Sequence, residues 1–265
     1  MSSKALLLKD VLVKNGVKFD ENSKIVIPSY IKKIKFDIGI STEAIHTENW
    51  LNHDPDDLLV FGFEALPYCA EKTKQYFSQP VSKWEKSTLY PFLNKNVINP
   101  KWLNNQFIIV SGGIGNTDAD SMNFHITNTD VGCSSILKPS KVLEAIGRSV
   151  NTIINIPMYR LSDFFELLPL HTLDHIDYIK VDVQGTDLDV IKGAGAYISD
   201  KVVFVTMESE TTQYEKAETN SLRHMIDYMK SIGFAYIKHP NTNDATFLNN
   251  KFQHLANSIY ISQFN

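Results

Sequence analysis

Acidic side chains follow two of the first predicted strands, where a nucleotide-binding protein would carry a glycine-rich loop. Asp37 and Gly39 lie in the stretch KFDIGIS, and Glu64 lies in VFGFEALP. A carboxylate repels a pyrophosphate, and the GxGxxG pattern of dinucleotide-binding proteins does not follow the first strand. Glu64 comes about 25 residues after Gly39, a spacing similar to that of the ribose-binding acid in such proteins. The two acids therefore predict a ligand with ribose hydroxyls, a cationic centre and no phosphate, as in S-adenosylmethionine.

Later predicted strands also end in polar residues. Asp182 and Gln184 end the stretch HIDYIKVDVQG, and Glu208 lies near the end of KVVFVTMESE. Ligands of open α/β sheets bind beyond the carboxyl ends of the strands, so these residues are candidates for the reacting centre. Asp182 is the first candidate, as hydrogen-bond partner of the cofactor amine or as base; Glu208 is the second, and His46 the third. Each acid could instead be a solvated strand end, and a lone histidine is more often structural than catalytic.

The elements that must position these residues alternate between apolar runs and amphipathic segments. Runs rich in β-branched and aromatic residues predict buried parallel strands, and the segments between them predict helices on both faces of the sheet. We expect one domain over residues 1–265, with 1–30 as an N-terminal extension. Segments 81–106 and 122–158 are predicted insertions, the second forming a β extension. The expected strands are 31–36, 57–64, 107–115, 122–127, 150–159, 175–185, 201–210, 234–239 and 257–264.

Two helices carry end signals in the sequence. TDLDVIKGAGAYI begins with Thr186, and Asp189 follows three positions later, which predicts a variant of the capping box. NSLRHMIDYMKSIG is strongly amphipathic and ends at Gly233, a predicted C-cap.

Composition excludes several other classes of protein. The chain has 265 residues and a formal net charge of -4, which gives no electrostatic basis for binding nucleic acid. No apolar run approaches the roughly 18 residues that span a bilayer, and the N-terminal apolar run is too short for a secretory signal. Cys69 and Cys133 have neither metal-ligand spacing nor a disulfide framework. The acids are dispersed, so we expect no metal, and we expect a soluble, cytoplasmic protein.

Several segments resemble the FkbM-type S-adenosylmethionine-dependent methyltransferases. They are FDIGIS, VFGFEALP, CSSIL, RLSDFFE and, most of all, IDYIKVDVQGTDLDVIKGA. The resemblance runs from about Lys35 to the C-terminal strand, and the segment 81–106 matches poorly. It implies a Rossmann-like class I methyltransferase fold with a mostly parallel seven-stranded sheet. It also implies methyl transfer, commonly to oxygen, here to a hydroxyl of a sugar, a glycan or a small metabolite.

The resemblance implies roles for individual residues. Asp37 and Gly39 match the D-x-G that borders the methionine half of the cofactor, and Glu64 is expected to bind both ribose hydroxyls. Ile114 and Gly115 follow the third strand, where this fold places adenine. Short polar or small residues at such turns are also common without a ligand. The expected cofactor-binding residues are Asp37, Gly39, Ser41, Glu64, Ala65, Ile114, Gly115, Ser134 and Ser135.

Two positions depart from the family pattern and motivate a second hypothesis. Glu43 stands where the family usually has glycine, and Gln184 stands where it more often has glutamate. The alternative is a non-catalytic binding or scaffold protein that retains the fold. An NAD-dependent oxidoreductase is disfavoured because GxGxxG is missing. Acceptor choice is expected to lie in segments 81–106 and 122–139.

Overall fold

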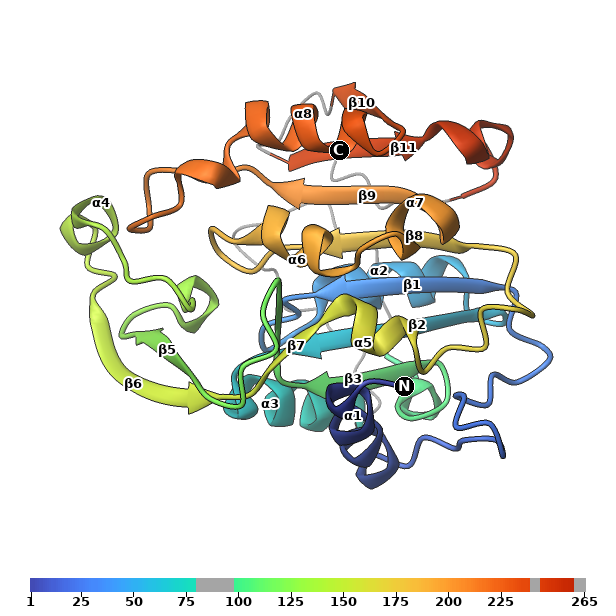
Figure 1. Ribbon diagram of the computed structural model, residues 1–265. Helices are drawn as coiled ribbons and strands as arrows, with labels where there is room; N and C mark the ends of the chain where they lie inside the picture. Colours follow the sequence, from blue (N-terminus) through green and yellow to red (C-terminus); the bar gives the residue numbers. More distant parts are fainter. Residues whose placement is uncertain (80–97, 239–243, 260–265) are drawn as a thin grey trace.

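A seven-stranded sheet forms the centre of the computed structural model, which describes residues 1–79, 98–238 and 244–259 (Figure 1). The strand order is β3-β2-β1-β8-β9-β11-β10. Neighbouring strands pair in parallel from β3 to β9, and β11 runs antiparallel to both of its neighbours. The prediction of a mostly parallel seven-stranded sheet is confirmed. The strands are β1 (Lys33–Ile38), β2 (Leu58–Glu64), β3 (Phe107–Ser111), β8 (Ile176–Val181), β9 (Val202–Glu208), β10 (Phe234–Lys238) and β11 (Asp244–Asn249).

Helices cover both faces of the sheet, as predicted. One face packs against five helices through a large apolar cluster that includes Leu8, Phe164 and Met225. The opposite face packs against two helices and two 3-10 turns through Trp50 and Phe77. The first group is α1 (Ser3–Lys14), α5 (Leu161–Phe165), α6 (Asp187–Gly193), α7 (Tyr197–Lys201) and α8 (Leu222–Ser231). The second is α2 (Ile45–His53), α3 (Pro67–Phe77), η1 (Pro100–Trp102) and η4 (Asn250–Leu255).

Strand β1 lies two residues later than the predicted strand 31–36. Its alternating side chains explain the shift, because Phe36 and Ile38 belong to one apolar cluster while Asp37 is buried toward the other face. Phe36 makes edge-to-face contacts with the rings of Phe61 and Phe164, at centroid distances of 5.7 Å and 5.4 Å. Asp37 therefore lies inside the strand and not at its end, which corrects the prediction.

The insertion 122–158 forms a β-hairpin beyond the carboxyl ends of the parallel strands (Figure 1). Its strands β5 (Met122–Thr127) and β6 (Val150–Ile156) pair antiparallel, which confirms the predicted β extension. The predicted single strand 150–159 is interrupted at Pro157, since proline cannot donate a ladder hydrogen bond. β7 (Met158–Arg160) then pairs with β4 (Gly113–Gly115), and α4 (Lys141–Ala145) lies within the insertion. Residues 81–97 of the other insertion lie outside the described residues.

Three local predictions at the C-terminal half are wrong. The helix expected after Thr186 is divided into α6 and α7, with Gly195 between them at φ +59°. Thr186 makes no side-chain cap hydrogen bond, so the predicted capping box is not formed. The last strand within the described residues is β11; residues 257–259, the start of the strand predicted over 257–264, form a turn and a bend, and 260–264 lie outside the described residues.

Other features at this end follow the sequence. Helix α8 is confirmed, and Gly233 follows it at φ +92°, the left-handed conformation of a glycine that closes a helix. None of the helices in the described ranges is long and apolar enough to cross a membrane.

Candidate active site

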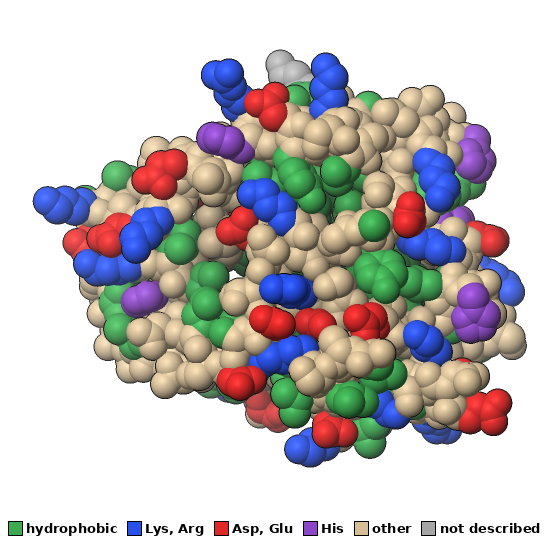
Figure 2. Space-filling model, in the orientation of Figure 1, with side chains coloured by type: hydrophobic (Ala, Val, Ile, Leu, Met, Phe, Trp, Pro, Cys, Tyr) green, Lys and Arg blue, Asp and Glu red, His purple; other side chains and the backbone are tan. Residues whose placement is uncertain are grey.

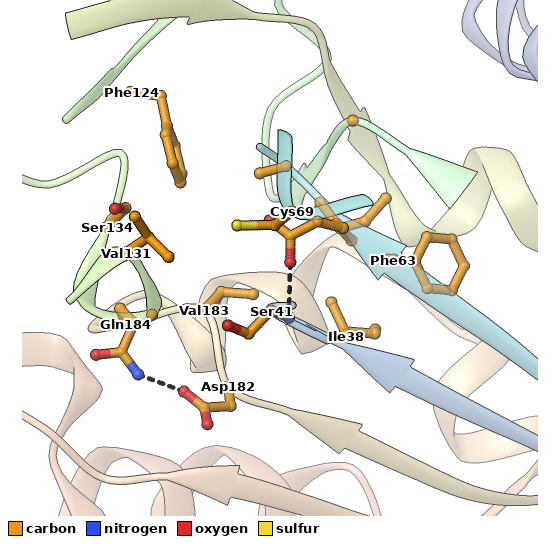
Figure 3. A pocket seen from close by; sticks show the side chains of 16 residues that line it. Ile38, Ser41, Phe63, Cys69, Phe124, Val131, Ser134, Asp182, Val183 and Gln184 are labelled. Atoms are coloured by element: carbon orange, nitrogen blue, oxygen red, sulfur yellow. Dashed lines mark hydrogen bonds between the residues drawn. The ribbon is translucent and has the colours of Figure 1, made fainter. Parts of the chain in front are cut away.

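A cavity opens at the carboxyl ends of β1, β2 and β8, below the β5–β6 hairpin (Figure 3). Its volume is about 180 Å³, and one buried water needs about 10–15 Å³ measured in the same way, so it holds far more than a single water. In the space-filling view, an opening lies between the lobe formed by the hairpin and α4 and the rest of the molecule (Figure 2). The predicted residues that line the cavity are Gly39, Ser41, Glu64, Ala65, Ile114, Ser134 and Asp182.

Glu64 is the carboxylate that β2 directs into this cavity. Its two oxygens accept hydrogen bonds from the backbone N–H groups of Ser41 and Leu66, both at 2.8 Å. Burial raises the pKa of Glu64 to about 7, and the backbone hydrogen bonds oppose that rise. A carboxylate has about four lone-pair sites, so each oxygen retains capacity for a ligand hydroxyl. Glu64 is therefore positioned to accept hydrogen bonds from a diol.

Gly39 brings the end of β1 against the end of β8. Its φ is +89°, and a Cβ atom at this position would overlap the carbonyl oxygen of Asp182. Ser41 in the same loop also has a left-handed backbone, with φ +55°, which is uncommon for a residue other than glycine. The tight loop keeps Gly39, Ser41 and Asp182 at one wall of the cavity.

Asp37 does not line the cavity, although the sequence suggested a cofactor contact. Its Oδ2 accepts hydrogen bonds from the N–H and the hydroxyl of Thr47, at 3.2 Å and 2.7 Å, and so fixes the first turn of α2. Burial raises the pKa of Asp37, and the nearby charge of Lys180 opposes this effect. Asp37 and Lys180 are register partners on adjacent strands, so their side chains share one face of the sheet. Asp37 therefore stabilises the start of α2 next to the cavity and does not contact a ligand in it.

Asp182 lies at the end of β8 within a cluster of polar groups. Lys180 Nζ is 3.0 Å from its Oδ2, and Gln184 Nε2 donates to its Oδ1 (Figure 3). Burial opposes ionisation, but the charge of Lys180 and these hydrogen bonds outweigh it and lower the pKa of Asp182. Asp182 is thus an anion that faces the cavity.

Glu208 and His46 lie next to the cavity but do not line it. Gln184 Nε2 donates to Glu208 Oε2 at 3.3 Å, and burial together with the charges of Asp182 and Asp187 raises the pKa of Glu208 to about 8. His46 is on α2, with its ring 6.0 Å from that of Trp50. Burial and Lys180 lower the pKa of His46 to about 3, which makes it a weak base at neutral pH.

The two predicted pairs at 114–115 and 134–135 are divided by the fold. Ile114 and Ser134 line the cavity, whereas Gly115 and Ser135 do not. Ser135 is buried, and its hydroxyl donates to the backbone carbonyl of Gln184 at 2.7 Å. Gly115 packs against Gly193 of α6, and a Cβ atom at Gly193 would overlap the carbonyl oxygen of Gly115. Ser135 and Gly115 therefore hold neighbouring elements in place.

Several residues at the cavity were not singled out by the sequence as site residues. Phe124 extends from β5 into the cavity, and Val131 lies beside it on the short 3-10 helix η2 (Val131–Cys133) (Figure 3). Gly132 of η2 also lines the cavity. Cys69 on α3 also lines the cavity. The strict alternation of MNFHIT was the only available indication, because it turns Phe124 and His125 to opposite faces. No group of three or more metal-binding side chains occurs within the described ranges.

The topology and the position of this cavity define a class of protein. A sheet of order β3-β2-β1-β8-β9-β11-β10, with a ligand cavity at the carboxyl ends of its central strands, is the Rossmann-like class I methyltransferase fold. The family model described as "Methyltransferase FkbM domain" matches residues 47–236, well over half of the sequence. The chain belongs to the FkbM methyltransferase family, which confirms the resemblance.

Solved structures with a similar arrangement are distant in sequence. The FkbM methyltransferase from Methylobacillus flagellatus KT is 12% identical with a TM-score of 0.45, over 94% of this chain and 55% of that chain. The delta-N METTL16 MTase domain is 9% identical (TM-score 0.40; 94% and 81% of the two chains). A human methyltransferase 10 domain containing protein is 8% identical (TM-score 0.36; 93% and 81%). This chain thus spans little more than half of the Methylobacillus protein. No curated protein matches it.

Proposed function

We propose that the protein is an S-adenosylmethionine-dependent methyltransferase that methylates a hydroxyl of a sugar, a glycan or a small metabolite. The observation that carries this proposal is the convergence of Gly39, Glu64 and Asp182, from three adjacent strands, on one cavity. The loop after β1 holds a single close-packed glycine instead of GxGxxG, and Glu64 at the end of β2 accepts a hydrogen bond from the Ser41 N–H of that loop, which suits a nucleoside without phosphate. The residues present therefore fit the cofactor that the family implies.

Each part of the cofactor has a matching group in the cavity. Glu64 would accept hydrogen bonds from the ribose hydroxyls, and the apolar side chains of Ile114 and Phe124 would cover adenine. Asp182 is an anion suited to the cationic methionine amine. When bound, the cofactor supplies a methyl group activated by a positive sulfonium. The chain's own task is to align the acceptor with it and to remove the hydroxyl proton.

The first test is binding of the two forms of the cofactor to the whole chain. We expect isothermal calorimetry to detect S-adenosylmethionine and S-adenosylhomocysteine, and we expect a panel of sugars and glycans to accept a radiolabelled methyl group. Absence of binding of either compound would favour the non-catalytic scaffold. Greater thermal stabilisation by NAD than by S-adenosylhomocysteine would favour an oxidoreductase instead.

Cofactor affinity should depend on pH through Glu64. Its pKa is raised to about 7, so the carboxylate is lost as the pH falls through 7, and a protonated acid accepts hydrogen bonds less well. The affinity for S-adenosylhomocysteine should rise about tenfold between pH 6 and pH 8, as the ionised fraction increases. Calorimetry at several pH values measures this change. The Glu64→Gln variant should lose that rise, and equal slopes in the two proteins would contradict the assignment.

A further inference from the structure

Gln184 makes more polar contacts at the cavity than its position in a short loop suggests. Its Nε2 donates to Asp182 Oδ1 and to Glu208 Oε2, and its Oε1 lies 2.7 Å from the hydroxyl of Tyr214. The amide is therefore oriented by its partners, because the two carboxylates need donors and the phenol supplies one. A glutamate here would place a third carboxylate against Asp182 and Glu208.

The backbone of Gln184 is held as firmly as its side chain. Its φ is +63°, a left-handed conformation that is uncommon for glutamine and that recurs at functional sites. The hydroxyl of Ser135 donates to its carbonyl at 2.7 Å, and the hydroxyl of the buried Tyr214 also lies 2.8 Å from the carbonyl oxygen of Cys133. The loop of β8 is thereby tied to the loop that follows β5, so the amide has a fixed place between the two acids.

The two carboxylates have unequal surroundings. Asp182 faces the cation Lys180 at 3.0 Å in addition to Gln184, whereas Glu208 contacts Gln184 at the longer distance of 3.3 Å. The groups whose charges act on Glu208 are the acids Asp182, Asp187 and Asp244, from β8, α6 and β11, and the cation Lys180 from β8. Three acids against one cation disfavour a further negative charge at Glu208. Glu208 thus binds a proton more readily than Asp182.

We propose that Gln184 is a positioning residue that gives the two carboxylates different tasks: Asp182 stays charged beside the methyl donor, and Glu208 accepts the proton of the acceptor hydroxyl. This inference rests on the proposed function. In the step, the acceptor oxygen bonds to the methyl carbon while the sulfur–methyl bond breaks and its electron pair stays on sulfur. Because Glu208 contacts Gln184 but does not itself line the cavity, the hydroxyl proton passes through one water to a carboxylate oxygen of Glu208 and from there to solvent.

The distribution of protons between the two acids can be measured without an acceptor. In protein labelled with ¹³C at glutamate and aspartate carboxyl carbons, the Glu208 signal is identified by its loss in Glu208→Gln, and that of Asp182 by its loss in Asp182→Asn. We expect Glu208 to titrate near pH 8 and Asp182 below its ordinary range. Gln184→Glu should raise the Glu208 midpoint by about one pH unit or more, a tenfold change in proton affinity. Gln184→Met should raise it less, since a donor is lost without an added charge.

A matched control carries the same change at the opposite edge of the sheet. Gln253 is exposed on η4, which follows the antiparallel strand β11 and so lies near the amino-terminal edge. Gln253→Glu should leave both midpoints unchanged. A Glu208 midpoint near 4.5 in the natural protein, or one unmoved by Gln184→Glu, would overturn this inference even if S-adenosylhomocysteine binds. Failure of S-adenosylhomocysteine to bind would instead overturn the proposed function. For an acceptor found in the panel, the rate should rise through about pH 8 and shift upward in Gln184→Glu.

Discussion

Gly39→Ala should destabilise the protein by about 3 kcal/mol or more and abolish cofactor binding. Gly39 has φ +89°, and an added Cβ would overlap the carbonyl oxygen of Asp182. That oxygen belongs to the backbone, so it cannot move aside as the end of a flexible side chain could. Relief requires separation of the ends of β1 and β8, which are joined by the hydrogen bond from Asp182 N to Ile38 O. Because these ends form one wall of the cavity, stability and binding should fall together. Urea unfolding and calorimetry with S-adenosylhomocysteine measure the two effects.

The chain offers a control that separates backbone strain from the clash. Gly16 has φ +84°, and a Cβ there would have no heavy atom within 4 Å. Gly16→Ala should cost only about 1–2 kcal/mol for the left-handed conformation and should leave S-adenosylhomocysteine affinity unchanged. If Gly39→Ala were no more destabilising than Gly16→Ala, the close approach of the two strand ends would be refuted.

The sheet and part of the site could be predicted from local patterns. Buried parallel strands need apolar residues on both faces, so a continuous apolar run such as DLLVFGFE can be recognised as a strand from the sequence. The polar residue at the end of such a run lies at the carboxyl edge of the sheet, where ligands bind. This worked for Glu64, since β2 ends at the expected residue. The same reasoning failed for Asp37. Charged and apolar residues alternate throughout KIKFDI, so a charged residue in this pattern does not mark the end of the strand. Because β1 ends two residues later than predicted, Asp37 does not contact a ligand and instead binds Thr47 at the start of α2.

Other parts of the site depend on contacts between distant segments, which one sequence does not encode locally. Phe124 reaches the cavity only because the β5–β6 hairpin folds over the carboxyl edge of the sheet. The role of Gln184 depends on Tyr214, 30 positions later, and on Ser135, 49 positions earlier. Strand β11, with the pattern DATFLN, was not predicted, and its place in the sheet depends on pairing with the distant strand β9 as well as with its sequence neighbour β10. These features require the tertiary structure.

Glu64→Ala should have the largest effect on cofactor affinity among single changes that remove a side-chain group from the cavity. Hydrogen bonds to a charged group contribute about 1.5–3 kcal/mol each, and two ribose hydroxyls would lose their acceptor. The N–H groups of Ser41 and Leu66 would also lose their partner, and Ser41 is already in a strained backbone conformation. We expect the dissociation constant of S-adenosylhomocysteine to rise at least about 100-fold, measured by calorimetry.

Two further variants make this result specific to the carboxylate. Glu71→Ala removes an acid from the exposed face of α3 and should leave the affinity unchanged. Glu64→Gln keeps the shape and one oxygen but turns a donor toward one of the two backbone N–H groups, so its affinity should lie between the natural protein and Glu64→Ala. Binding by Glu64→Ala as tight as that of Glu71→Ala would place the nucleoside elsewhere. In that case Glu64 would serve only to hold the loop after β1 and the start of α3 together, through its hydrogen bonds with the N–H groups of Ser41 and Leu66.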